Sequence, residues 1–113
     1  MNGAGPIDRD VLERLNPDDL PQLAAFLGGY LHEDWTLDYG SAAEAAWDYL
    51  LEADLEAAEA LAVEWSVLAA AARLVSLDEL NSMLRARFRT GWNVVHADEI
   101  RAVSEELERA LEE

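Results

Sequence analysis

The sequence predicts an all-α protein, a single compact bundle of four to five helices. Twenty alanines favour helix, and the three prolines all lie within the first 21 of the 113 residues, so little interrupts a helix after them. Runs that alternate apolar and polar residues, as strands do, are missing; the nearest candidate, residues 92–95, is too short to form a sheet. Hydrophobic residues make up 51% of the chain, enough for one folded core.

Residues 1–15 are expected to form a loose lead-in with room for a short helix, and residues 16–113 a single helical domain. The first firm helix is predicted over residues 21–31. Asp18 and Asp19 stand just before it, where their carboxylates can accept hydrogen bonds from its first amides. Its buried face is predicted to contain Leu23, Phe26, Leu27 and Tyr30.

Two adjacent glycines, Gly28 and Gly29, stand inside this first helix. A glycine destabilises a helix by roughly 1 kcal/mol relative to alanine, so the pair predicts that another segment packs closely against the helix backbone. A loop is expected over residues 32–40. Its aromatic residues, Trp35 and Tyr39, are candidates for contact with a partner, although packing over the two glycines explains them more economically.

Capping boxes of the form Ser-x-x-Glu begin at Ser41 and at Ser76, and each predicts the start of a helix. Asp54 can cap a further helix between them, so we prefer a break near Ala53 to one continuous helix over residues 42–75. The core face of the helix that follows Ser41 is predicted to contain Ala43, Ala46, Trp47, Leu50 and Leu51.

Helical spacing of apolar residues also predicts the buried faces of the last three helices. The helix that follows Asp54 has Leu55, Ala58, Leu61, Ala62, Trp65, Leu68, Ala69 and Ala72. The next helix ends at Gly91 and buries Leu77, Leu80, Leu84 and Phe88. A final helix, capped by Asp98 or a neighbouring residue, buries Ile100, Val103, Leu107, Ala110 and Leu111.

The chain has 24 acidic residues against eight arginines and no lysine, a net charge of −16. Such a surface repels the phosphates of nucleic acids and of anionic lipids, which argues against both as partners. The lack of cysteine excludes disulfides and thiolate metal sites. Because no signal peptide and no apolar run of membrane-spanning length is found, the protein is expected to be cytoplasmic.

No residue pattern predicts an enzyme, a cofactor or a metal site. The densest cluster of potential ligands is His32, Glu33, Asp34 and Asp38, but its spacing matches neither a calcium loop nor a zinc site. The other histidine, His96, stands near the start of the last helix, where a capping or surface role is expected. A phosphate-binding glycine loop, a nucleophile elbow and a Ser/His/Asp set are all missing.

The negative charge is concentrated in the first part of the chain, since residues 1–72 hold 15 acidic residues and two arginines. Glu44, Asp48 and Glu52 follow one another at intervals of four, so they form one stripe along a helix and repel each other. Glu56 and Glu59 extend the stripe if the helix continues. Such a face either serves solubility alone or docks a strongly basic partner.

Residues 26–35 read Phe-Leu-Gly-Gly-Tyr-Leu-His-Glu-Asp-Trp, and Leu-Asp-Tyr-Gly over residues 37–40 leads into the capping box at Ser41. This segment resembles the small all-helical immunity proteins of contact-dependent growth inhibition systems, in which a Phe-Leu-Gly sequence, then an aromatic residue and then Asp-Trp precede a short loop and an alanine-rich helix. The resemblance is closest over residues 20–55. It implies a cytoplasmic, non-enzymatic antidote that binds and blocks the C-terminal toxin domain of a polymorphic toxin, commonly a nuclease.

A motif shared by proteins that meet different toxins is expected to serve the fold, so the resemblance implies a structural role for Phe26, Gly28, Gly29, Tyr30, Asp34 and Trp35. The predicted toxin-binding residues lie elsewhere: Glu44, Asp48, Glu52, Glu56 and Glu59, with Glu33 and Asp38 at the rim. A nuclease needs a cationic cleft for its substrate, and an acidic protein can occupy that cleft. The alternative is a non-enzymatic adaptor that binds a partner helix in an apolar groove, with the acidic face for solubility only.

Overall fold

The computed structural model describes residues 6–112, which contain six α-helices and one 3-10 helix. The elements are α1 (Pro6–Arg14), α2 (Pro21–Gly29), η1 (Trp35–Leu37), α3 (Ala42–Glu52), α4 (Leu55–Leu74), α5 (Leu77–Phe88) and α6 (Ala97–Glu112). These residues contain no strand, so the all-α prediction is confirmed. The predicted count of four to five helices is too low, because the short helix allowed for in the lead-in is a regular helix, α1.

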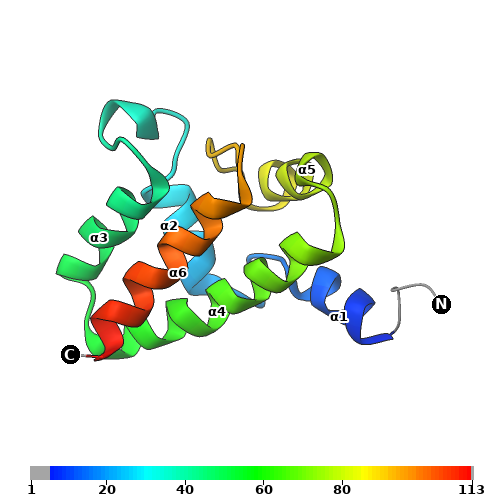
Figure 1. Ribbon diagram of the computed structural model, residues 1–113, viewed down its shortest axis with the longest axis horizontal. Coiled ribbons are helices and arrows are strands. Elements are labelled where there is room, and N and C mark those ends of the chain that lie inside the picture. Colours follow the sequence, from blue (N-terminus) through cyan, green and yellow to red (C-terminus); the bar gives the residue numbers. More distant parts are fainter. Residues whose placement is uncertain (1–5, 113) are drawn as a thin grey trace.

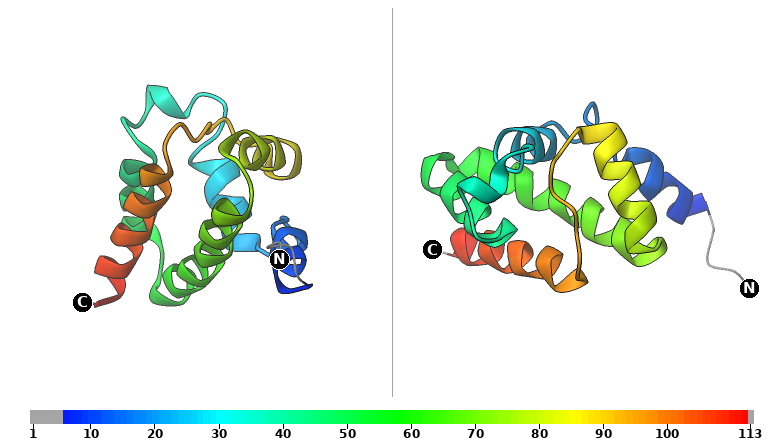
Figure 2. Two further views of the ribbon diagram at one scale, coloured as in Figure 1. Left: turned by 45° about the vertical axis from the view of Figure 1, so that its right-hand side comes forward. Right: turned by 90° about the horizontal axis from the view of Figure 1, so that it is seen from above.

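Helix α6 lies between α3 and α4 and packs against both of them (Figure 1). The 20-residue helix α4 is the centre of the fold, since it also contacts α1, α2 and α5. The segment that joins α2 to α3 and the segment that joins α5 to α6 meet at one end of the bundle (Figure 2). No helix within residues 6–112 combines the length and the apolar character needed to cross a membrane.

Side-chain caps at Ser41, Asp54 and Ser76 begin α3, α4 and α5, as predicted. Each side-chain oxygen accepts a hydrogen bond from the amide three residues later, at 2.8 Å in the case of Asp54. Ala53, between α3 and α4, has an extended backbone with φ −79° and ψ 144°. The break near Ala53 is therefore confirmed, and the continuous helix over residues 42–75 is wrong.

The first turn of α2 is capped by a side chain from α4. The Leu23 amide donates to Glu64 Oε1 at 2.8 Å, and no side chain just before the helix caps it. Asp19 instead accepts a hydrogen bond from Asn16 Nδ2 in the preceding loop. The predicted capping of α2 by Asp18 and Asp19 is therefore wrong, because the packing of α2 on α4 brings a distant carboxylate to the same amide.

The close backbone packing predicted for Gly28 and Gly29 is also wrong. Both glycines are exposed, and a Cβ atom added to either would meet nothing within 4 Å. The closely packed glycine is Gly91, where a Cβ atom would lie 2.5 Å from the carbonyl oxygen of His32. Nor does Gly91 end α5, because Arg89 already terminates that helix in the left-handed conformation, with φ 57°.

An aromatic cluster joins α2, α3 and α4 in the core. Phe26 lies at its centre, with its ring centroid 5.7 Å from that of Tyr49 and 5.9 Å from those of Tyr30 and Trp65. Trp65 also stacks on Trp92, with 5.8 Å between the centroids, and both tryptophans are buried. The predicted burial of Trp65 is confirmed. Two of the residues expected to serve the fold, Phe26 and Tyr30, thus pack in or against the core.

Helix α3 buries Ala42, Ala45, Ala46 and Tyr49. The predicted face overlaps this one only in part: Ala46 is buried and Leu50 is half-buried, as expected. Trp47 and Leu51 are 57% and 62% exposed, and Leu55 at the start of α4 is 65% exposed, so the predicted burial of these three side chains is wrong. Apart from the stripe of Glu44, Asp48 and Glu52, the residues of α3 are apolar or aromatic, and helical spacing alone does not decide between overlapping apolar faces. The buried alanines belong to the core, and α3 packs against α6.

Candidate functional site

Three carboxylates on α3 are fixed by hydrogen bonds from the segment over residues 30–40. Glu44 accepts one from a backbone amide of that segment at 3.1 Å. Asp48 and Glu52 each accept one from a tyrosine hydroxyl, at 2.6 Å and 3.2 Å. All three donors are neutral, so the carboxylates are held in position while their negative charge remains uncompensated.

The two tyrosine donors are Tyr39, which binds Asp48, and Tyr30, which binds Glu52. The hydrogen bond to Asp48, together with burial, raises the pKa of Tyr39 to about 12. Burial and the hydrogen bond to Glu52 raise the pKa of Tyr30 as well. Both hydroxyls therefore stay protonated at neutral pH and continue to orient the carboxylates.

The other predicted binding residues lie on two further segments. Glu56 and Glu59 are exposed on α4, beyond the helix break, so the five residues of the predicted stripe are divided between two helices. Glu33 and Asp38 are exposed on either side of η1. Asp38 Oδ2 lies 3.6 Å from His32 Nε2. We call the whole set the acidic surface: Glu33, Asp38, Glu44, Asp48, Glu52, Glu56 and Glu59.

Basic side chains within residues 6–112 leave most of the acidic surface unpaired. Within residues 6–112, Arg101 pairs with Asp98 and Arg109 with Glu106, neither of which belongs to the acidic surface, and the imidazole of His32 lies beside Asp38. Six of the seven acidic-surface carboxylates therefore have no basic partner in the described part of the chain. Like charges four residues apart on a helix destabilise it by a few tenths of a kcal/mol per pair, and a cationic partner would remove that repulsion.

Three large apolar side chains near these carboxylates were not predicted as site residues: Trp47, Leu51 and Leu55. Positions 44, 47, 48 and 51 follow the spacing i, i+3, i+4, i+7, so Trp47 and Leu51 share one face of α3 with Glu44 and Asp48. That face is exposed apart from the half-buried Asp48. The same spacing is visible in the sequence, but it becomes informative only once the alanine face is known to be the buried one.

The two aromatic residues proposed as contact anchors are engaged inside the protein. Trp35 is half-buried and donates its indole N–H to the carbonyl oxygen of Gly91 at 3.3 Å. Tyr39 is half-buried and donates its hydroxyl hydrogen bond to Asp48, as described above. Asp34 has an exposed side chain, and its amide donates to His32 Nδ1 at 3.0 Å. Among the side chains that the structure describes, over residues 9–112, no group of three or more His, Asp or Glu could hold a metal ion.

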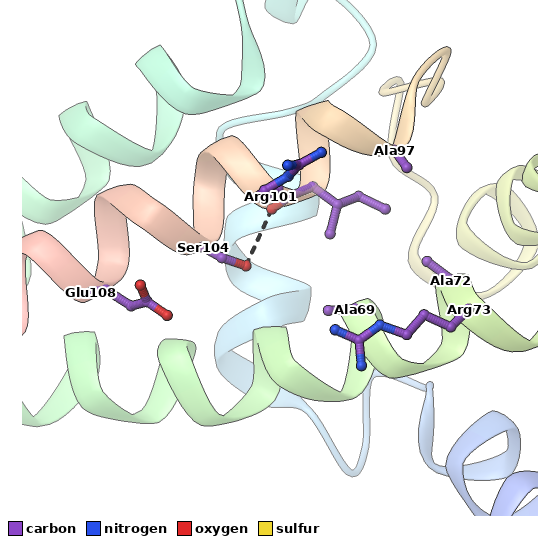
Figure 3. Close-up of a pocket in the computed structure, with 8 residues that line it drawn as sticks. Ala69, Ala72, Arg73, Ala97, Arg101, Ser104 and Glu108 are labelled. Carbon is purple, nitrogen blue, oxygen red and sulfur yellow. Dashed lines mark hydrogen bonds between the residues drawn. The ribbon is translucent and has the colours of Figure 1, made fainter.

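A cavity of about 370 Å³ lies between α4 and α6 (Figure 3). Arg73, Arg101 and Glu108 line it together with small side chains, and no residue of the acidic surface does. Ser104, the hydroxyl residue in its wall, donates to the carbonyl oxygen of Ile100 at 3.3 Å. Among the described residues, the hydrogen bond of that hydroxyl goes to the helix backbone and not to the carboxylate of Glu108.

Comparison with known protein families identifies a matching family. The family model described as CdiI immunity protein matches residues 19–92, about two-thirds of the chain. The comparisons with curated proteins and with solved structures gave no match. The matched range includes α2 to α5 and the entire acidic surface. The chain therefore belongs to the CdiI immunity protein family and is an immunity protein that neutralises a cognate toxin.

Proposed function

We propose that this immunity protein binds the C-terminal toxin domain of its cognate growth-inhibition protein through the acidic surface and covers the toxin's substrate cleft. The observation that carries the proposal is the set of α3 carboxylates that neutral donors hold in place and that lack basic partners. Because these side chains are already ordered, less conformational entropy is lost when a cationic surface binds them.

A nuclease is the toxin that fits this surface best. Its cleft must attract a polyanion and is therefore lined with Lys and Arg. Clustered carboxylates are complementary to such a cleft and accelerate association through long-range attraction. On this proposal the immunity protein acts in the cytoplasm, performs no catalysis and needs no cofactor, because covering the cleft is enough to stop the toxin.

The gene immediately upstream is expected to supply the partner, as a large secreted protein that ends in a small basic domain. We would measure association of that toxin domain with the immunity protein by stopped flow at increasing ionic strength, and nuclease inhibition in parallel. The triple variant Glu44→Gln, Asp48→Asn, Glu52→Gln keeps the hydrogen-bond acceptors but removes three charges. We expect its association rate at low salt to fall about tenfold or more, with a weaker salt dependence.

A matched control removes three charges elsewhere: Asp18→Asn, Asp78→Asn and Glu105→Gln, all at exposed positions. This variant has the same net charge as the first, and its association rate should stay close to that of the wild type. Equal losses in both variants would show that only net charge matters. If the association rate changed neither in the two triple variants nor with ionic strength, the acidic-surface mechanism would be contradicted and binding in an apolar groove would be favoured. A failure to bind the toxin domain at all would contradict the partner assignment.

A further inference from the structure

We infer that Trp47 and Leu51 are the apolar anchor of the toxin interface and insert into an apolar pocket of the toxin whose rim is basic. The inference rests on the proposed function, since the partner is the same toxin domain. It adds a division of roles: the carboxylates of the acidic surface attract the toxin, and the two apolar side chains on α3 slow its dissociation.

Trp47 differs from the other three tryptophans of the chain. Trp35, Trp65 and Trp92 are buried or half-buried, and each donates its indole N–H to an oxygen of the protein at 3.1 to 3.3 Å. Trp47 is 57% exposed, and its indole N–H has no acceptor within residues 6–112. Neither burial nor a hydrogen bond within the fold therefore explains why a tryptophan, the largest side chain on α3, is at position 47. Tryptophan in an exposed position is the residue type most characteristic of interface hot spots.

The surroundings of Trp47 have the composition of an interface centre. Leu51, one turn further along α3, is 62% exposed, and the next large apolar residue along the chain, Leu55 at the start of α4, is 65% exposed. Glu44 and Asp48 lie on the same face as Trp47 and Leu51 because of the i, i+3, i+4, i+7 spacing. An apolar centre with a charged rim excludes water from the anchors and leaves the charges to select the partner.

Charge determines what can cover this face. A second copy of the chain would bring Glu44 and Asp48 of both copies together, and the net charge of −16 opposes that approach. Nucleic acid and anionic membranes are repelled in the same way. A protein that carries Lys or Arg around an apolar pocket is attracted by the carboxylates at the rim, and its pocket can accommodate Trp47 and Leu51. The toxin domain proposed above is such a protein.

The test compares single alanine variants in binding kinetics with the toxin domain by surface plasmon resonance. Trp47→Ala is expected to raise the dissociation constant about 30-fold or more, and Leu51→Ala about fivefold or more. Both losses should arise from faster dissociation, with the association rate changed less than about threefold. The charge-removing triple variant should show the reverse: slower association, with a dissociation rate that changes less. Circular dichroism should show that Trp47→Ala and Leu51→Ala fold normally, because neither side chain is buried.

Val95→Ala is the matched control, because Val95 is 62% exposed and lies between α5 and α6, away from α3 along the chain. Its dissociation constant should stay within about twofold of wild type. Unchanged dissociation in Trp47→Ala and Leu51→Ala, with slower association in the triple variant, would overturn the anchor assignment and leave the proposed function intact. Sedimentation of the wild type as a dimer that Trp47→Ala dissociates would make a second copy the occupant and also overturn it. A toxin domain that does not bind the wild type would overturn both proposals.

Discussion

Replacing Gly91 by alanine is expected to lower the free energy of unfolding by about 2–3 kcal/mol. The added Cβ atom would lie 2.5 Å from the His32 carbonyl oxygen and 2.7 Å from the Glu33 Cα atom, and backbone atoms cannot rotate away as side chains do. Two hydrogen bonds to the Leu31 carbonyl oxygen, from the Gly91 amide and the Thr90 hydroxyl, hold the two segments at that separation. Chemical denaturation monitored by circular dichroism measures the loss.

Gly28→Ala is the matched control for this prediction. Gly28 is an exposed helical residue with space for a Cβ atom, so alanine there should raise the free energy of unfolding by about 0.5–1 kcal/mol. The two substitutions make the same chemical change and are expected to have opposite effects. If Gly91→Ala were as stable as Gly28→Ala, the loop over residues 31–41 would not pack against the α5–α6 connection as described.

Replacing Asn81 by alanine is expected to lower the free energy of unfolding by about 3 kcal/mol. Asn81 is 7% exposed, and its side chain makes two hydrogen bonds to one residue of the α5–α6 connection. Its Nδ2 donates to the Val94 carbonyl oxygen at 2.9 Å, and its Oδ1 accepts from the Val94 amide at 2.8 Å. Alanine would leave both backbone groups of a buried residue without partners.

Asn93→Ala serves as the control for Asn81, because Asn93 is exposed and accepts one long hydrogen bond from Arg85, at 3.5 Å. Its substitution should change the free energy of unfolding by no more than about 0.5 kcal/mol. Thermal and urea denaturation of both variants measures the difference. Similar stability of the two variants would contradict the role of Asn81 in holding the α5–α6 connection at Val94.

Local signals in the sequence predicted the starts of the helices better than the faces they bury. Ser41, Asp54 and Ser76 cap their helices as expected, because a cap depends on residues three positions apart. The cap of α2 comes from Glu64, 41 residues after the amide it accepts from, and no local pattern contains that contact. Likewise, the closely packed glycine is Gly91 because of a neighbour almost 60 residues away in the chain.

In the candidate site, too, local spacing predicted some features, and others depend on tertiary packing. The regular spacing of Glu44, Asp48 and Glu52 placed them on one helix, and all three accept hydrogen bonds from the preceding segment. The spacing of Trp47 and Leu51 predicts the core, because an apolar side chain at helical spacing is normally buried. They are exposed because the face of α3 that is buried in the core consists of three alanines and Tyr49. Only the tertiary packing of α3 shows which face is buried.

The most direct test of the binding face is oxidative footprinting of the immunity protein with and without its toxin domain. Hydroxyl radicals modify exposed side chains, and mass spectrometry locates each modification. We predict that Trp47, Leu51 and Leu55 react readily in the free protein and are protected in the complex, while Val95 reacts equally in both states. Protection confined to the α4–α6 cavity around Arg73 and Arg101, with Trp47 still reactive in the complex, would contradict the assignment of toxin binding to the acidic surface and its apolar anchor.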